Sequence, residues 1–189
     1  MANTIFDFIG GINGEWKVTS MTTLKGNPIT SVSHLKKVPG DLAQTESGIW
    51  TLKGIVSNLR YTEKEDKDKL VAVQEDLGRP QATLAAFIPI RKSETWWNLA
   101  QDERRKIMEN KSQHTQTGMK YLPAIARKLF HSRDIGEPFD FLTWFEYAPA
   151  DADAFEELLV ALRKTEEWTY VDREIDIRLV KSVQTLIHN

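Results

Sequence analysis

The sequence predicts an α+β fold in which helices pack against antiparallel β-sheet, with the chain divided into two ferredoxin-like halves. Strand patterns dominate the first half, and the second half is expected to run helix, strand, strand, helix, strand. The chain has 189 residues, 41% hydrophobic and 28% charged, which is enough for a sizeable core. We expect an N-terminal half over residues 1–93 and a C-terminal half over residues 94–189. No internal sequence repeat supports the duplication.

The strands of the first half are predicted from alternation and from β-branched residues. WKVTSMTTL (16–24) alternates as a half-buried strand should. GIWTLKGIVSNLRY (48–61) is typical of a long strand, in which Gly54 is expected to form a bulge or a bend. LVAVQEDL (70–77) and ATLAAFIPI (82–90) are two further strand candidates.

A change of period predicts a helix over ETWWNLAQDERRKIMENK, ending at about Ser112. Asn98 followed by Gln101 resembles a capping box. Pro123 should stop any helix that continues past His114. ARKLFHS and FDFLTWFEY then predict a β-hairpin around Gly136.

The last two elements are a helix and a strand. Asp151 is the expected N-cap of the helix ADAFEELLVALRKTEE. Its apolar residues recur at helical spacing and should form one buried stripe. EIDIRLVK (174–181) predicts the final strand. The members of the helical stripe are Phe155, Leu158, Leu159 and Leu162.

Composition argues against several classes of protein. The 25 basic and 27 acidic residues are interspersed, so we expect no nucleic-acid partner. The chain has no cysteine, which removes disulfides, thiolate metal ligands and cysteine nucleophiles. The start has neither a basic region nor a sustained apolar run, so we expect no signal peptide, no membrane anchor and a cytoplasmic location.

His114 is the first candidate for chemistry, because it stands between a polar helix and a short apolar segment. A half-exposed surface histidine is the simpler interpretation. No HxxxH or HExxH spacing is present, so a zinc site built from protein ligands alone is not predicted. One histidine can nevertheless anchor a haem, since the porphyrin supplies four other ligands.

Arg127 and His131 lie four apart in a predicted strand and therefore face the same way, with Leu129 between them. Such a face is either an edge in contact with water or the wall of a polar pocket. The adjacent indoles of Trp96 and Trp97 suit a flat cofactor, an interface or packing under the start of a helix.

Other polar residues give weaker signals. Glu166 and Glu167 are predicted to end a helix, where the dipole disfavours negative charge, although a solvated face explains them equally well. SNLRY (57–61) and Lys92 offer donors that could hold carboxylates or phosphates. Gln74 could reach a cavity from its predicted strand.

Three stretches together resemble the chlorite dismutase family of haem enzymes. They are SNLRYTEKEDK (57–67), TWWNLAQDERRKIMENKSQHTQ (95–116), and YLPAIARKLFHS followed by DFLTWFEY (121–147). The specific feature is the HTQ element with an arginine thirteen positions later, directly before KLFHS. The resemblance implies a dimeric ferredoxin-like barrel with haem b as its cofactor.

The resemblance also implies roles for individual residues. His114 would be the proximal ligand of the haem iron, and Arg127 the mobile distal arginine. Glu167 would accept a hydrogen bond from the proximal imidazole, with Glu166 as the alternative, and Lys92 would join this network. No catalytic role is implied for His131. The haem edge would be contacted by Asn58, Tyr61 and Trp97, and the distal side by Gln74.

The implied reaction converts chlorite to chloride and dioxygen with formation of an O–O bond, and Arg127 would act as an electrostatic clamp on the anion. The short first half is similar to a lineage of homodimers in this family. A coproheme decarboxylase of the same fold is a rival, but that branch carries glutamine at the position of Arg127. A peroxidase-like haem protein, a non-catalytic haem carrier and a module without cofactor stay open.

Overall fold

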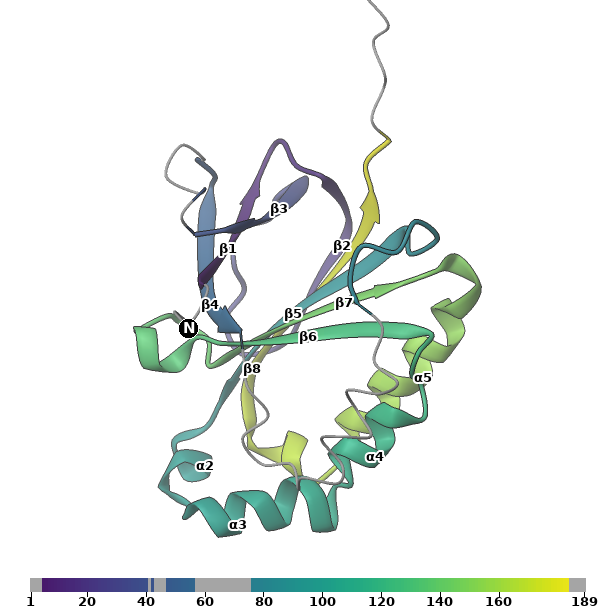
Figure 1. Ribbon diagram of the computed structural model, residues 1–189. Coiled ribbons are helices and arrows are strands. Elements are labelled where there is room, and N and C mark those ends of the chain that lie inside the picture. Colours follow the sequence, from purple (N-terminus) through teal and green to yellow (C-terminus); the bar gives the residue numbers. More distant parts are fainter. Residues whose placement is uncertain (1–4, 41, 43–46, 57–75, 184–189) are drawn as a thin grey trace, which may run out of the picture.

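The computed structural model describes residues 5–40, 42, 47–56 and 76–183, and its strands form a closed antiparallel barrel (Figure 1). Around the barrel the strands follow the order β1-β3-β2-β8-β5-β7-β6-β4, and the last strand returns to β1. The strands are β1 (Ile5–Gly11), β2 (Trp16–Lys25), β3 (His34–Pro39), β4 (Trp50–Val56), β5 (Leu84–Lys92), β6 (Ile125–His131), β7 (Phe141–Tyr147) and β8 (Val171–Lys181).

The helices gather on one side of β5, β6, β7 and β8, where Figure 1 shows them below the barrel. This side therefore forms a second layer on the sheet. The helical elements are α2 (Glu94–Asn98), α3 (Gln101–Arg105), the π-helix η2 (Lys106–Lys111), α4 (His114–Met119), α5 (Ala152–Arg163) and the 3-10 turns η3 (Arg133–Ile135), η4 (Pro149–Asp151) and η5 (Glu167–Tyr170).

The predicted mixture of antiparallel sheet and packed helices is confirmed, but two strands were not predicted. In β1, which reads IFDFIGG, the last five residues are buried on both faces, so the strand shows no alternation. In β3, the lysines of HLKKVP suggest a surface segment, although Leu35 is fully buried.

The single helix predicted from residue 94 to about Ser112 is wrong. Leu99 and Ala100 have extended backbone and separate α2 from α3, whereas α3 continues directly into the π-helix η2. The Glu103 carboxylate accepts the backbone N–H of Ala100 at 2.8 Å. The capping interaction is therefore two residues beyond the predicted Asn98.

Two further local predictions fail. Gly54 is not a bulge, because it pairs with Phe6 in an unbroken register; a Cβ there would lie 2.6 Å from the Cβ of Phe130. Close approach of β6 thus explains this glycine. The last helix ends at Arg163 and not at Glu167; Asp151 does occupy its N-cap position, as predicted, although its side chain makes no capping hydrogen bond.

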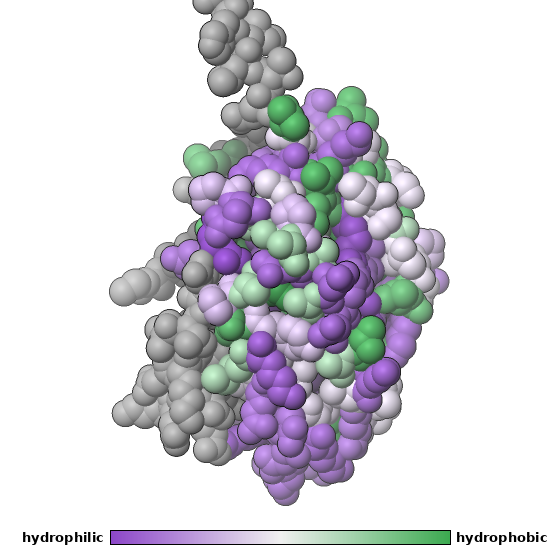
Figure 2. Space-filling model, turned by 90° about the vertical axis from the view of Figure 1, so that its right-hand side faces the viewer, coloured by the Kyte–Doolittle hydropathy of each residue, from purple (hydrophilic) through white to green (hydrophobic). Residues whose placement is uncertain are grey.

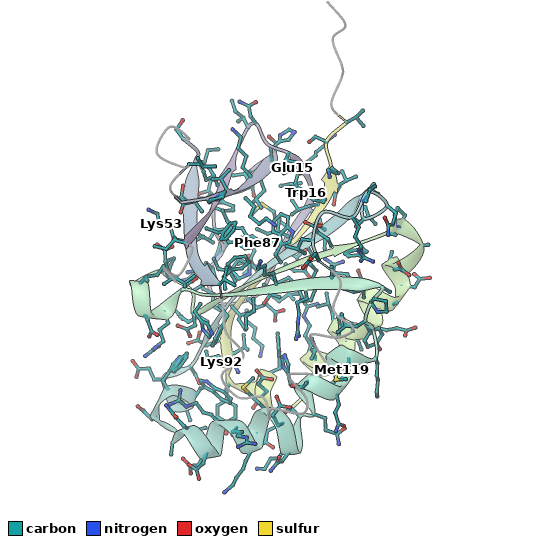
Figure 3. All side chains as sticks on the ribbon, viewed as in Figure 1. Glu15, Trp16, Lys53, Phe87, Lys92 and Met119 are labelled. Carbon is teal, nitrogen blue, oxygen red and sulfur yellow. The ribbon has the colours of Figure 1, made fainter. Side chains whose placement is uncertain are left out.

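Alternation along β5 separates two cores. Ala85 and Phe87 belong to the cluster inside the barrel, whereas Ala86 and Ile88 belong to the cluster under the helices. Figure 3 shows Phe87 among the barrel side chains and Lys92, further along the same strand, next to the helical layer. The sheet therefore presents one face to a closed core and the other to the functional site.

The outer surface is mainly polar where Figure 2 shows it, with hydrophobic side chains scattered among hydrophilic ones. None of the helices in the described ranges is long and apolar enough to cross a bilayer.

Candidate functional site

A pocket lies between the sheet and the helical layer. It encloses about 910 Å³, part of which is open to solvent, and most of its wall is apolar. The lining residues used below are Lys92, Trp97, His114, Arg127, His131, Glu167, Trp168 and Glu174.

The polar face of β6 forms one wall of this pocket. Arg127, Leu129 and His131 all line it, as their spacing on a strand requires. The sequence left a water-facing edge and a pocket wall as alternatives, and the pocket wall is the one observed. The ring of His131 packs edge-on against Phe141 at 5.2 Å between centroids.

His114 begins α4 and lines the pocket. The residue before it, Gln113, has a left-handed backbone with φ of 48°, an uncommon conformation for a residue other than glycine. The His114 Nδ1 lies 2.7 Å from Oε2 of Glu167. Because Nδ1 is engaged there, Nε2 is the imidazole nitrogen that can bind a metal ion.

Glu167 is the centre of a buried polar network. The residue is 3% exposed, and its carboxylate accepts hydrogen bonds from His114 and from Lys92 Nζ, the latter at 2.6 Å. Its backbone N–H donates to Ser112 Oγ at 3.1 Å. Burial alone would raise the pKa of this carboxyl, but His114 and Lys92 hold the pKa well below its ordinary value. Glu167 is therefore an anion that fixes the imidazole.

The choice between Glu166 and Glu167 is settled by geometry. Glu166 lies outside the pocket and pairs with Lys111 at 3.3 Å on the surface. The prediction that both residues end a helix is wrong, since α5 ends at Arg163 and Glu167 begins the separate turn η5.

Lys92 reaches Glu167 from the end of β5, just after a register shift between Arg91 and Lys92. Its ammonium lies 3.6 Å from the ring centre of Trp96. Burial lowers the pKa of Lys92, and the nearby Glu167 carboxylate opposes this shift. Asp140 holds the strand end, since its Oδ2 accepts the Lys92 backbone N–H at 2.7 Å.

Trp97 also depends on Asp140. Its indole N–H donates to Asp140 Oδ2 at 3.0 Å, and its ring stacks on Phe141 at 6.0 Å between centroids. The guanidinium of Arg133 lies 4.1 Å from the ring centre of Trp97. Trp97 is thus fixed on both sides at the pocket wall.

Arg127 is half-buried and reaches from β6 toward α4, because a Cβ at Gly118 would lie 3.5 Å from its Nη1. Burial lowers the pKa of this guanidinium, while the carboxylates of Glu167 and Glu109 oppose the shift. A guanidinium keeps its proton throughout the working pH range. Arg127 therefore gives the pocket wall a permanent positive charge.

The structure thus brings together Lys92, Trp97, His114, Arg127 and Glu167 among the predicted site residues. Asn58, Tyr61 and Gln74 lie outside the described residues. The described part of the chain holds no group of three or more metal-ligating side chains.

Sequence reasoning missed four residues that support the site. Ser112 and Asp140 form hydrogen bonds to residues 55 and 48 positions away, whereas Trp168 and Glu174, which are 6 positions apart, bond to each other. No short motif identifies either kind of pair.

Comparisons with known proteins identify the family. The family model for chlorite dismutase matches residues 30–183. A curated chlorite dismutase from Ideonella dechloratans is 32% identical over 142 residues, which covers 69% of this chain. The match spans only 46% of that relative's length.

Solved structures extend the comparison. The dimeric chlorite dismutase from Nitrobacter winogradskyi has a TM-score of 0.87 and 53% identity, over 94% of this chain and 99% of that one. The chlorite dismutase from Candidatus Nitrospira defluvii in complex with imidazole is 20% identical with a TM-score of 0.65, over 95% of this chain and 92% of that one, and supports the fold alone. The chain therefore belongs to the chlorite dismutase family.

Proposed function

We propose that this protein is a haem b-dependent enzyme that converts chlorite to chloride and dioxygen. The observation that carries the proposal is the pairing of His114 with Glu167 in an apolar pocket that Arg127 also lines. The 53% identical relative from Nitrobacter winogradskyi is a dimeric chlorite dismutase, which supports the same activity here.

The residues present fit a haem. The pocket is lined mainly by apolar side chains, as a porphyrin requires, and His114 offers one imidazole nitrogen for an iron ion. A site with a single metal-binding side chain suits haem, because the porphyrin itself supplies four ligands. Bound haem would supply the electron exchange between its iron and the oxygen atoms of the substrate.

Glu167 and Lys92 would set the properties of the proximal imidazole. Glu167 accepts the hydrogen bond of His114 Nδ1 and so increases the electron donation of this imidazole to a metal. Lys92 in turn holds the other carboxylate oxygen at 2.6 Å and keeps Glu167 ionised and oriented.

Arg127 would bind the chlorite anion by charge and by its fork of N–H donors. It would also retain the chlorine-containing fragment until the O–O bond forms, because holding two reactants together avoids the cost of a bimolecular encounter. The apolar wall of the pocket limits the water that could compete for this fragment.

Trp97 is proposed to contact the haem edge, since it lines the pocket in a fixed orientation. Asn58 and Tyr61 at the haem edge and Gln74 on the distal side stay predictions from the family resemblance.

The quaternary structure is proposed to be a homodimer, as the 53% identical relative is dimeric. The cytoplasmic location stays a prediction of the sequence.

We also propose that the barrel consists of two related halves, each ferredoxin-like in strand order. β4-β1-β3-β2 and β8-β5-β7-β6 both follow the order fourth, first, third, second. The predicted boundary at residue 93 falls after β5, whereas β5 pairs with β7 and β8, so we place the division before β5. A ferredoxin-like unit also has helices that connect its strands. Among the described residues, such helices occur in the second half, between β5 and β8.

The proposal is tested by giving chlorite to haem-loaded protein and measuring dioxygen with an oxygen electrode and chloride in parallel. Equal catalytic release of both products is expected.

Arg127→Ala should keep its haem, lose turnover about 100-fold or more and leak hypochlorite, since the clamp is absent. Unchanged turnover in this variant would contradict the proposed role of Arg127 in holding the anion. A haem-loaded wild type that is inert toward chlorite would favour a peroxidase, a carrier or a coproheme decarboxylase.

A further inference from the structure

The orientation of Glu167 depends on a turn of only four residues, η5. One end of this turn is tied to the sheet, because Ser93 donates its backbone N–H to the Tyr170 carbonyl at 2.7 Å. Lys25 Nζ also donates to the carbonyls of Trp168 and Val171, at 3.0 and 3.2 Å. The Glu167 backbone N–H donates to Ser112 Oγ at 3.1 Å, and a further link comes from the side chain directly after Glu167.

That side chain is Trp168, whose indole N–H donates to Glu174 Oε2 at 2.9 Å. Both residues line the pocket, and Glu174 is only 1% exposed. A buried carboxylate needs partners, and an indole N–H has one fixed direction. The bond therefore fixes the rotation of Trp168 relative to β8.

Arg163 completes the arrangement from the last turn of α5. Its guanidinium contacts Glu174 Oε1 through Nη2 at 2.7 Å and through Nε at 2.8 Å. Nη2 also lies 2.9 Å from Asp176 Oδ2. Each oxygen of Glu174 thus has its own donor, one from Arg163 and one from Trp168, so the carboxylate cannot rotate without losing one.

We propose that Trp168, fixed by Glu174 and Arg163, is a positioning residue that holds Glu167 against His114. This inference rests on the proposed function, because the effect is measured as the redox potential of a haem iron bound by His114. Without the indole bond, η5 can shift relative to β8. The contact from Glu167 to His114 then lengthens, and the imidazole donates less electron density to iron.

The test is the ferric–ferrous midpoint potential of the haem-loaded Trp168→Phe variant. Phenylalanine keeps an aromatic ring against the pocket and removes only the donor. We expect the equilibrium to shift about threefold toward ferrous iron, or about 28 mV, since tenfold corresponds to about 59 mV for one electron. An unchanged potential would contradict the proposal.

The chain offers a matched control in Trp144→Phe. Trp144 is fully buried, whereas Trp168 is half-buried, and it too donates its indole N–H to a buried carboxylate, Glu146 Oε1 at 2.8 Å, but inside the barrel. Its replacement should reduce stability at least as much as that of Trp168 and leave the potential unchanged. An equal shift of the potential in both variants would mean that general loosening is the cause and would overturn the proposal.

A double-mutant cycle separates positioning from direct contact between Trp168 and the ring. In a Glu167→Gln background the anionic acceptor is already absent, so adding Trp168→Phe should not shift the potential further. A full additional shift would show that Trp168 acts on the ring itself, and the positioning role would be wrong.

A measurement on the haem-free protein distinguishes failure of this inference from failure of the proposed function. Nitrogen-15 NMR of the His114 Nδ1–H should show its exchange with solvent at least threefold faster in Trp168→Phe than in Trp144→Phe. Equal exchange would refute the positioning role even if no haem binds. Absence of a Soret band after hemin addition would refute the haem function alone.

Discussion

Both faces of the same sheet carry buried glutamates that pair with tryptophan and lysine, but the surroundings of these pairs differ. Inside the barrel, Trp144 donates to Glu146 at 2.8 Å, and Lys37 lies 4.0 Å from the same carboxylate. On the other face, Trp168 donates to Glu174 at 2.9 Å, and Lys92 lies 2.6 Å from Glu167. The difference lies in what surrounds these pairs.

The barrel side is filled, whereas the helix side leaves space. Phe8 and Phe87 stack at 4.5 Å between centroids in the barrel, and both are fully buried. The helix side keeps a pocket of about 910 Å³, with Lys92 and Glu167 in its wall. Stability is therefore concentrated inside the barrel, and the capacity to bind a ligand lies on the other face.

The largest expected effect on stability comes from Phe87→Ala. Removing this buried ring should lower the free energy of unfolding by about 3–5 kcal/mol, since it leaves a cavity in a packed core. Urea unfolding of the haem-free protein measures the change. Leu129→Ala, on the half-buried pocket wall, should cost less than half as much. An equal loss of unfolding free energy in both variants would contradict the conclusion that stability is concentrated inside the barrel.

A smaller effect is expected from Lys92→Met, which leaves Glu167 with one side-chain partner instead of two. Haem affinity should fall about 10–100-fold, as is typical when a group that orients a metal ligand is lost. Titration with hemin gives the affinity. The matched variant Lys37→Met, inside the barrel, should bind haem as tightly as the wild type does. An equal loss of haem affinity in both variants would contradict the role of Lys92 in orienting Glu167.

The smallest effect is the contribution of Glu167 to the pH dependence of stability. Its pKa in the folded state lies below the ordinary value of 4.5, so the stabilisation is complete above about pH 4.5 and is lost as the pH falls toward the folded pKa. Wild type and Glu167→Gln should therefore differ most above pH 4.5 and converge in acid. Urea midpoints across this range test the sign, and a difference that grows in acid would contradict it.

The sequence was informative where a residue pattern is local. The apolar run around Phe87 and the helical stripe with Leu158 predicted β5 and α5. The spacing of Arg127, Leu129 and His131 predicted a shared face, and the resemblance singled out His114 and Arg127 before any geometry was available.

The rest depends on contacts between distant segments. β1 is buried on both faces and shows no alternation, and the helix break at Leu99 and Ala100 has no glycine or proline to mark it. Asp140 is 48 residues from Lys92, and Glu167 is 53 residues from His114. Only the closed barrel brings these pairs together.

The most direct measurement compares hemin titrations of two histidine variants. His114 and His131 line the same pocket, but the account assigns a metal-binding role to His114 alone. We predict stoichiometric binding with a Soret band for wild type and His131→Ala, and loss of the band or at least 100-fold weaker binding for His114→Ala. Undiminished binding by His114→Ala would contradict the account of this pocket.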